Sequence, residues 1–143
     1  MMKTVYLVTE GRTDQVVISG LVQEWLAPAD FVIRSIQPPS SDFAATLTDS
    51  LSEGWKGVLN WCNGARAGTA VSRAAVLRQA DCLIIHIDTD VATDRDFRDP
   101  PFQGAFNPAR PACDWMRERL ASAFADGLPA NVVLCVPSVD MDA

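Results

Sequence analysis

The chain has 143 residues, of which 48% are hydrophobic, and carries 12 basic against 18 acidic residues, a net charge of −6. This length suits one domain with a substantial core, and no stretch approaches the roughly 20 apolar residues that a membrane helix needs. The N-terminus lacks the length and the small-residue cleavage site of a signal peptide, so we expect a cytoplasmic protein. The negative charge disfavours tight binding to a phosphate backbone unless bound cations offset it.

The cysteine pattern excludes two further classes of protein. The four cysteines lie far apart and form no C-x-x-C pair, and the chain has only one histidine. A structural zinc site needs clustered ligands, which this spacing does not supply. A disulfide framework is not expected either, because two of the cysteines lie inside apolar runs, where cysteine behaves as a small hydrophobic residue.

Apolar and β-branched runs predict four buried strands, over residues 4–9, 30–39, 82–87 and 131–137. Between them, apolar residues recur at helical spacing and predict four helices. These cover residues 15–26, 42–54, 69–79 and 112–127.

The remaining segments and the helix ends are predicted from local signals. Residues 55–68 fit either a helix or a packed loop, and the proline-rich segment 90–111 is predicted to be a long loop. Thr13 or Asp14 can cap the first helix, Pro28 ends it, and Gly127 ends the last one. The tryptophans are predicted to pack in the core, namely Trp25, Trp55, Trp61 and Trp115.

Strands that alternate with helices indicate βαβ units and a mainly parallel sheet covered on both faces. We therefore expect one Rossmann-like α/β domain over residues 1–143, with a four-stranded sheet flanked by helices. Ligands of such sheets bind outside the carboxyl ends of the strands. Acidic residues follow three of the predicted strands at that edge: Glu10, Asp88, and then Asp140 and Asp142.

The segment "IIHIDTDVATDRDF" concentrates four aspartates after the third strand: Asp88, Asp90, Asp94 and Asp96. Taken alone, these residues fit a solvated loop, and "EGRTD" after the first strand fits a turn in which Gly11 adopts an unusual backbone angle. Taken together, carboxylates that meet at one edge repel one another unless a cation or a proton lies between them. Hard oxygen ligands of this kind suit Mg²⁺ or Mn²⁺.

His86 lies inside the third strand, two residues before Asp88. A histidine at such a position is usually a satisfied core residue. Strand alternation nevertheless places it on the same side as Asp88, so a role in supporting the site stays open.

The stretch "VYLVTEGRTD", followed at the third strand by "LIIHIDTDV", resembles the Toprim domain of topoisomerases, primases and OLD-type nucleases. That family carries a glutamate and glycine after the first strand and a D-x-D after the third, on a compact Rossmann-like sheet. The resemblance covers most of the chain in element order, although the motifs are short. It is closest to small stand-alone Toprim proteins related to OLD nucleases and to the DUF4276 group, which often accompany defence systems.

The resemblance implies a Mg²⁺- or Mn²⁺-dependent nuclease or phosphotransfer enzyme acting on DNA or RNA, either alone, as a homo-oligomer or with a partner protein. Glu10, Asp88 and Asp90 would be its catalytic residues and metal ligands. Gly11 and Arg12 would contact the substrate phosphate. Further metal ligands would come from Asp142, with Asp94, Asp96 and Asp140 as secondary candidates.

Departures from the family keep other functions open. The only tyrosine, Tyr6, lies inside the first strand, which excludes topoisomerase-type covalent cleavage. In the DUF4276 group a tryptophan and a helix follow the fourth strand, whereas this sequence stops at "VPSVDMDA", so we expect a domain that lacks its C-terminal helix or a shortened protein. The alternatives are a non-catalytic Toprim-like module that binds metal and nucleic acid or nucleotide, and a fragment of a GT-A-like glycosyltransferase, to which "IIHIDTDV" has a local similarity.

Overall fold

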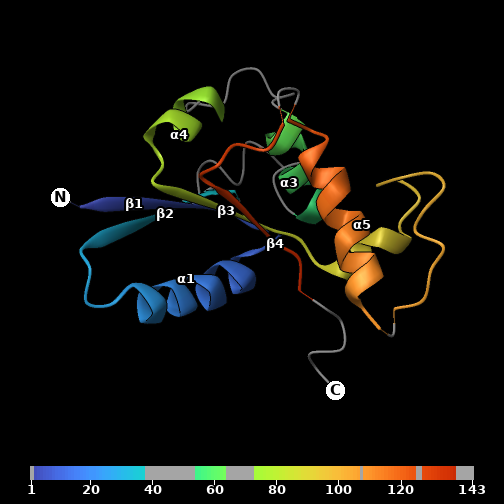
Figure 1. Ribbon diagram of the computed structural model, residues 1–143, viewed down its shortest axis with the longest axis horizontal. Coiled ribbons are helices and arrows are strands. Elements are labelled where there is room, and N and C mark those ends of the chain that lie inside the picture. Colours follow the sequence, from blue (N-terminus) through green and yellow to red (C-terminus); the bar gives the residue numbers. More distant parts are fainter. Residues whose placement is uncertain (1, 38–53, 64–72, 107, 125–126, 138–143) are drawn as a thin grey trace.

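The computed structural model (Figure 1) describes residues 2–37, 54–63, 73–106, 108–124 and 127–137. In this part of the chain, four parallel strands form one sheet in the order β2-β1-β3-β4. The predicted α/β fold with a four-stranded parallel sheet flanked by helices is confirmed. The strands are β1 (Lys3–Val8), β2 (Phe31–Gln37), β3 (Cys82–His86) and β4 (Val132–Cys135).

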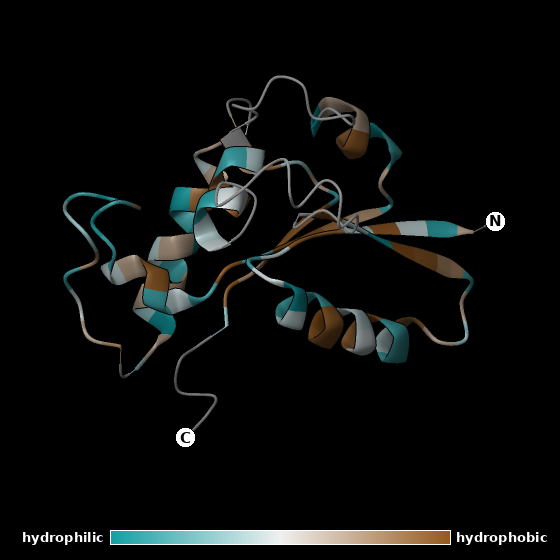
Figure 2. Cartoon of the chain, turned by 180° about the vertical axis from the view of Figure 1, so that it is seen from behind, coloured by the Kyte–Doolittle hydropathy of each residue, from teal (hydrophilic) through white to brown (hydrophobic). Residues whose placement is uncertain are grey.

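Helices cover both faces of the sheet. Helix α1 lies against one face, and the other helices lie on the opposite side, as both views show (Figures 1 and 2). A short 3₁₀ helix, η2, follows β3 directly. The helices are α1 (Arg12–Leu26), α3 (Gly54–Asn63), α4 (Arg73–Gln79), η2 (Thr89–Thr93) and α5 (Arg110–Ala121).

Side-chain alternation along the strands divides the core into two clusters. On the α1 side, Val5 and Leu7 of β1 pack with Ile18 and Val22 of α1. On the opposite side, a larger cluster joins the sheet to the other helices. Apolar residues make up most of β1, β3 and β4 (Figure 2), as expected for strands of a parallel sheet buried on both faces, whereas β2 also carries Arg34, Ser35 and Gln37. The larger cluster includes Tyr6, Val8, Leu83, Ile85, Ile87, Val58, Val76 and Met116.

The helix boundaries differ from the sequence predictions at several points. The first helix begins at Arg12 after Gly11, and no side chain caps it, so the prediction of a Thr13 or Asp14 cap is wrong. Both residues instead lie inside the first turn. The last helix ends at Ala121, well before Gly127, which has a φ of 88°.

The structure describes parts of the segments 55–68 and 90–111, for which the sequence predicted a helix or packed loop and a long loop, respectively. Residues 54–63 form helix α3 rather than a packed loop. The predicted loop 90–111 begins inside η2, and its end already belongs to α5. The predicted helix over 42–54 lies outside the described residues except for Gly54.

The tryptophans are buried to very different extents. Trp61 is buried, and Trp55 and Trp115 pack at the edge of the larger cluster. Trp25 is 69% exposed, so its predicted core position is wrong. The reason is that α1 buries only Ile18 and Val22, and its last turn extends past this contact. None of the described helices combines the length and apolar character that crossing a bilayer requires.

Candidate metal centre

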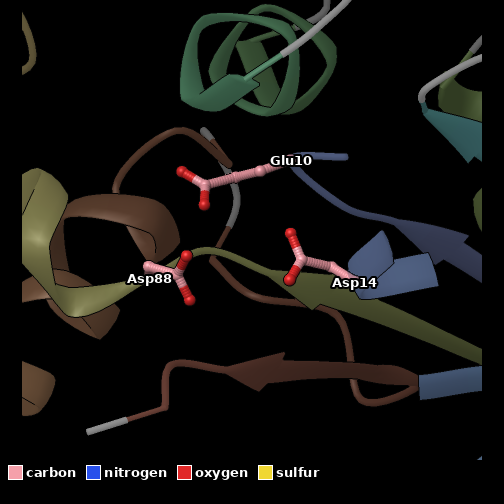
Figure 3. A group of neighbouring side chains, drawn as sticks. All are labelled: Glu10, Asp14 and Asp88. Carbon is pink, nitrogen blue, oxygen red and sulfur yellow. The ribbon is translucent and has the colours of Figure 1, made fainter. Parts of the chain in front are cut away.

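Three carboxylates meet at the carboxyl edge of the sheet. Glu10 follows β1, Asp14 lies in the first turn of α1, and Asp88 follows β3. One oxygen atom of each lies within 4.8 Å of the others, and all three residues are half-buried. Figure 3 shows their side chains facing a common space. We call this group the carboxylate cluster.

The strand pairing brings Glu10 and Asp88 together. Strands β1 and β3 are parallel neighbours, with Val8 opposite Ile85, so the residues that follow each strand emerge at the same edge. The backbone of Glu10 is also fixed from outside the sheet, because its carbonyl accepts a hydrogen bond of 2.8 Å from the Gly54 N–H at the start of α3. The Thr9 hydroxyl donates to the Gly11 carbonyl at 3.0 Å and holds the turn into α1.

Asp88 occupies the N-cap position of η2, yet its side chain makes no capping hydrogen bond. Its carboxylate is therefore directed to the cluster rather than to the helix end. The next residue, Thr89, is fully buried, and its hydroxyl donates a hydrogen bond of 2.6 Å to the Pro137 carbonyl. This bond ties the end of β3 to the chain beyond β4 and fixes the point at which Asp88 leaves the sheet.

The electrostatics of the cluster follow from its crowding. Burial, a side-chain hydrogen bond with Asp88 and the Asp88 charge raise the pKa of Glu10 from 4.5 to about 8, with a further contribution from Asp90. A backbone hydrogen bond with Asp88 lowers that pKa by less than these effects raise it. Without a cation, this raised pKa favours the protonated form of Glu10 at neutral pH. A proton on Glu10 relieves the repulsion between the carboxylates, as a bound cation would.

The structure places Asp90 outside the cluster. Asp90 is exposed, although it is near enough to contribute to the raised pKa of Glu10. An extended chain would put Asp88 and Asp90 on one side, because side chains alternate with a period of two. Here the chain turns into the 3₁₀ helix at Thr89, with three residues per turn, so Asp90 points in another direction.

Asp94 and Asp96 are likewise placed away from the cluster. Asp94 accepts a hydrogen bond of 3.2 Å from the Trp55 indole N–H and one of 2.9 Å from the Asp96 backbone N–H. These bonds give Asp94 a structural role in attaching α3 to the segment after η2. Asp96 is exposed. The other two predicted ligands, Asp140 and Asp142, lie outside the described residues.

The predicted phosphate contacts lie beside the cluster. Gly11 has a φ of −153°, an extended conformation open to any residue, so the expectation of an unusual backbone angle there is wrong. A Cβ at Gly11 would come 3.9 Å from Asp14 Oδ2, an ordinary contact, so the space at this position does not require a glycine. Arg12 is exposed as the first residue of α1.

Sequence reasoning assigned Asp14 to a helix cap and missed it as a member of the cluster. The available signal was its position, because a helix that starts directly after a strand presents its first turn at the same edge as the strand end. The positive end of the helix dipole also favours a carboxylate there.

The donor atoms of the cluster are of the type that binds a small divalent cation, whereas their spacing is slightly too wide. Its oxygen donors are those that Mg²⁺ prefers, and Mg–O bonds of about 2.1 Å put ligand oxygens about 3 to 4 Å apart. The observed limit of 4.8 Å is wider by an ångström or so, which side-chain rotation can close because the terminal torsion of a carboxylate is soft.

Comparisons of the chain with protein-family models, with curated proteins and with solved structures found no match. Function is therefore inferred from the fold and from the carboxylate cluster.

Proposed function

We propose that the protein binds Mg²⁺ or Mn²⁺ at the carboxylate cluster and cleaves phosphodiester bonds in nucleic acid, as a Toprim-type nuclease. The observation that carries this proposal is the convergence of Glu10, Asp14 and Asp88 at the carboxyl end of a parallel sheet. This is the edge at which ligands of such folds bind. The order of motifs along the chain, E-G after the first strand and D-x-D after the third, supports the same assignment.

The residues around the cluster have complementary roles in this proposal. Glu10, Asp14 and Asp88 would hold the cation, which would supply Lewis-acid activation of water and stabilise the leaving oxygen. Gly11 would let the backbone approach the phosphate closely, and Arg12, the first residue of α1, would contact that phosphate. Asp90, exposed beside the cluster, adds negative charge that attracts a cation.

A bound cation would offset the negative charges of the carboxylates and of the nucleic acid, which favours this proposal over a hydrolase without a metal. Nucleic acid brings further negative charge to an edge where three carboxylates already lie together and the whole chain carries −6. Cation binding removes the repulsion within the cluster and the repulsion between cluster and phosphate at once.

The first test is thermal unfolding against Mg²⁺ and Mn²⁺. A cation that binds only the native state raises its stability by about 2.7 kcal/mol at 100 times the dissociation constant. In the parent we expect a rise that grows with the logarithm of the cation concentration above the dissociation constant, and in Asp88→Asn no rise. The control is Asp99→Asn, which removes an exposed aspartate outside the cluster and should keep the response.

The second test measures cleavage of end-labelled single- and double-stranded DNA and RNA with each cation. Cleavage that requires the cation and is lost in Asp88→Asn but kept in Asp99→Asn supports the nuclease. Saturable cation binding without cleavage of any of these substrates contradicts the nuclease and favours the non-catalytic binding module. No cation binding in the parent contradicts both.

A further inference from the structure

His86 is the last residue of β3 and lies buried beside Asp88, one member of the carboxylate cluster. It is only 6% exposed, and it lies on the α1 side of the sheet because side chains alternate and the neighbouring Ile84 contacts the α1 cluster. Its Nε2 faces Asp88 Oδ1 at 3.7 Å. Its other nitrogen, Nδ1, has no hydrogen-bond partner among the described residues.

Packing alone does not explain why a histidine occupies this buried position. A buried polar atom without a partner costs about 1–3 kcal/mol, and an apolar side chain of similar shape would avoid that cost. Among the described residues, the polar group that faces the His86 ring is the carboxylate of Asp88. The histidine is therefore explained best by what its Nε2 does for that carboxylate.

The separation of 3.7 Å is slightly longer than a hydrogen bond. The Asp88 carboxylate also lies within 4.8 Å of oxygen atoms of Glu10 and Asp14. The Asp88 carboxylate can turn about its soft terminal torsion when a cation binds beside it. A displacement of less than 1 Å would then bring Oδ1 into hydrogen-bond range of Nε2.

We propose that His86 is a positioning residue whose Nε2–H holds one oxygen of Asp88, so that the other oxygen faces the cation together with Glu10 and Asp14. This inference rests on the proposed metal centre. Hydrogen bonds to ligating carboxylates orient them, and their loss commonly lowers metal affinity by about 10- to 100-fold. A ring that donates from Nε2 can leave Nδ1 as an acceptor, which agrees with the absence of a hydrogen-bond partner for Nδ1 among the described residues.

The affinity test compares His86→Leu with His86→Gln, using titrations of Mg²⁺ and Mn²⁺ followed by calorimetry. We expect His86→Leu to raise the dissociation constant by about 10- to 100-fold. Glutamine carries an amide donor near the position of Nε2 and should restore most of the affinity. Ile84→Val, on the same strand and the same face, controls for a small packing change and should bind as the parent does.

The second measurement uses the fact that His86 is the only histidine in the chain. Nitrogen-15 labelling of histidine therefore gives one imidazole in the NMR spectrum of the unmodified protein. We expect the Nε2-protonated tautomer, a saturable shift of the Nε2 signal with Mg²⁺, and broadening by Mn²⁺. None of these cation effects should occur in Asp88→Asn.

The two proposals fail in distinguishable ways. If the parent binds the cation but His86→Leu binds it equally well, the positioning role is wrong and the metal centre stands. The positioning role is also wrong if the ring carries its proton on Nδ1, a result that does not require any variant to fold. If the parent binds no cation, the metal centre is wrong and the role of His86 falls with it.

Discussion

Replacing Glu10 by glutamine should stabilise the metal-free protein at neutral pH and leave its stability unchanged at pH 4. The folded-state pKa of Glu10 is raised from 4.5 to about 8, mainly by burial and by the neighbouring Asp88. Between these two values the folded state keeps a proton that the unfolded state has lost. The free energy of unfolding must therefore fall as the pH rises from 4.5 to 8.

The magnitude follows from the size of the shift. Each pKa unit corresponds to about 1.36 kcal/mol, so the full shift sets an upper limit near 5 kcal/mol. Glu10 is only half-buried, and solvent screening reduces the effect to about 2 kcal/mol. Glutamine has the shape of the protonated side chain but cannot ionise, so the variant should gain about this amount at pH 8, less at pH 7 and nothing at pH 4.

The assay is denaturant unfolding of parent and variant from pH 4 to pH 9 in the presence of a chelator. Glu24→Gln is the matched control, because Glu24 is an exposed glutamate on α1 outside the cluster, and it measures the general effect of removing one negative charge. A Glu10→Gln gain that is the same at pH 4 and pH 8, or no larger than that of the control, refutes the reasoning. Saturating Mg²⁺ should reverse the order of stability, because it binds the parent and not the variant.

Three further substitutions test the placement of individual residues. Asp90→Asn should weaken Mg²⁺ binding by less than about tenfold, because Asp90 acts only through screened charge. Asp88→Asn should abolish Mg²⁺ binding. Equal losses for the two variants in calorimetric titrations would show that Asp90 is a ligand. Trp55→Phe removes the indole hydrogen bond to Asp94 and should cost about 1–2 kcal/mol in denaturant unfolding, with unchanged cation affinity. Gly11→Ala should change the unfolding free energy by less than about 1 kcal/mol, because the backbone there is extended and a Cβ has room; a larger loss would show that the turn needs glycine.

The sheet and two members of the cluster, Glu10 and Asp88, could be predicted from the order of apolar runs and polar residues in the sequence. Four apolar runs separated by helical patterns define a parallel sheet, and the polar residues that follow two adjacent strands must then meet at one edge. This argument needs no precise geometry, so it succeeds for Glu10 and Asp88 even though the predicted strand ends were off by a residue or more.

The rest of the cluster depends on local geometry that residue patterns do not specify. Asp14 joins the cluster because α1 begins at Arg12, earlier than its apolar periodicity suggests. Asp90 is left outside because the chain changes from an extended strand to a 3₁₀ helix within two residues. Both outcomes depend on where an element starts, which is the least reliable feature of a sequence prediction.

The cluster includes a residue of α1, a helix that is packed less firmly than α5. Helix α1 buries only Ile18 and Val22, whereas α5 buries four residues along its length. Helix α1 should therefore open locally at a lower free energy than α5. A cation held by Glu10, Asp14 and Asp88 would link the first turn of α1 to the ends of β1 and β3, so any opening that lifts this turn must first release the cation.

Hydrogen exchange measures this coupling directly. At a Mg²⁺ concentration of 100 times the dissociation constant, amides of α1 that exchange through this opening should slow by up to about 100-fold. Amides of α5 that exchange through openings elsewhere should change less. The same experiment on Asp14→Asn should abolish the difference between the helices, since Asp14 is the link from α1 to the cluster. Equal slowing in α1 and α5 of the parent would mean that α1 does not open on its own, and the cluster would then stabilise only the fold as a whole.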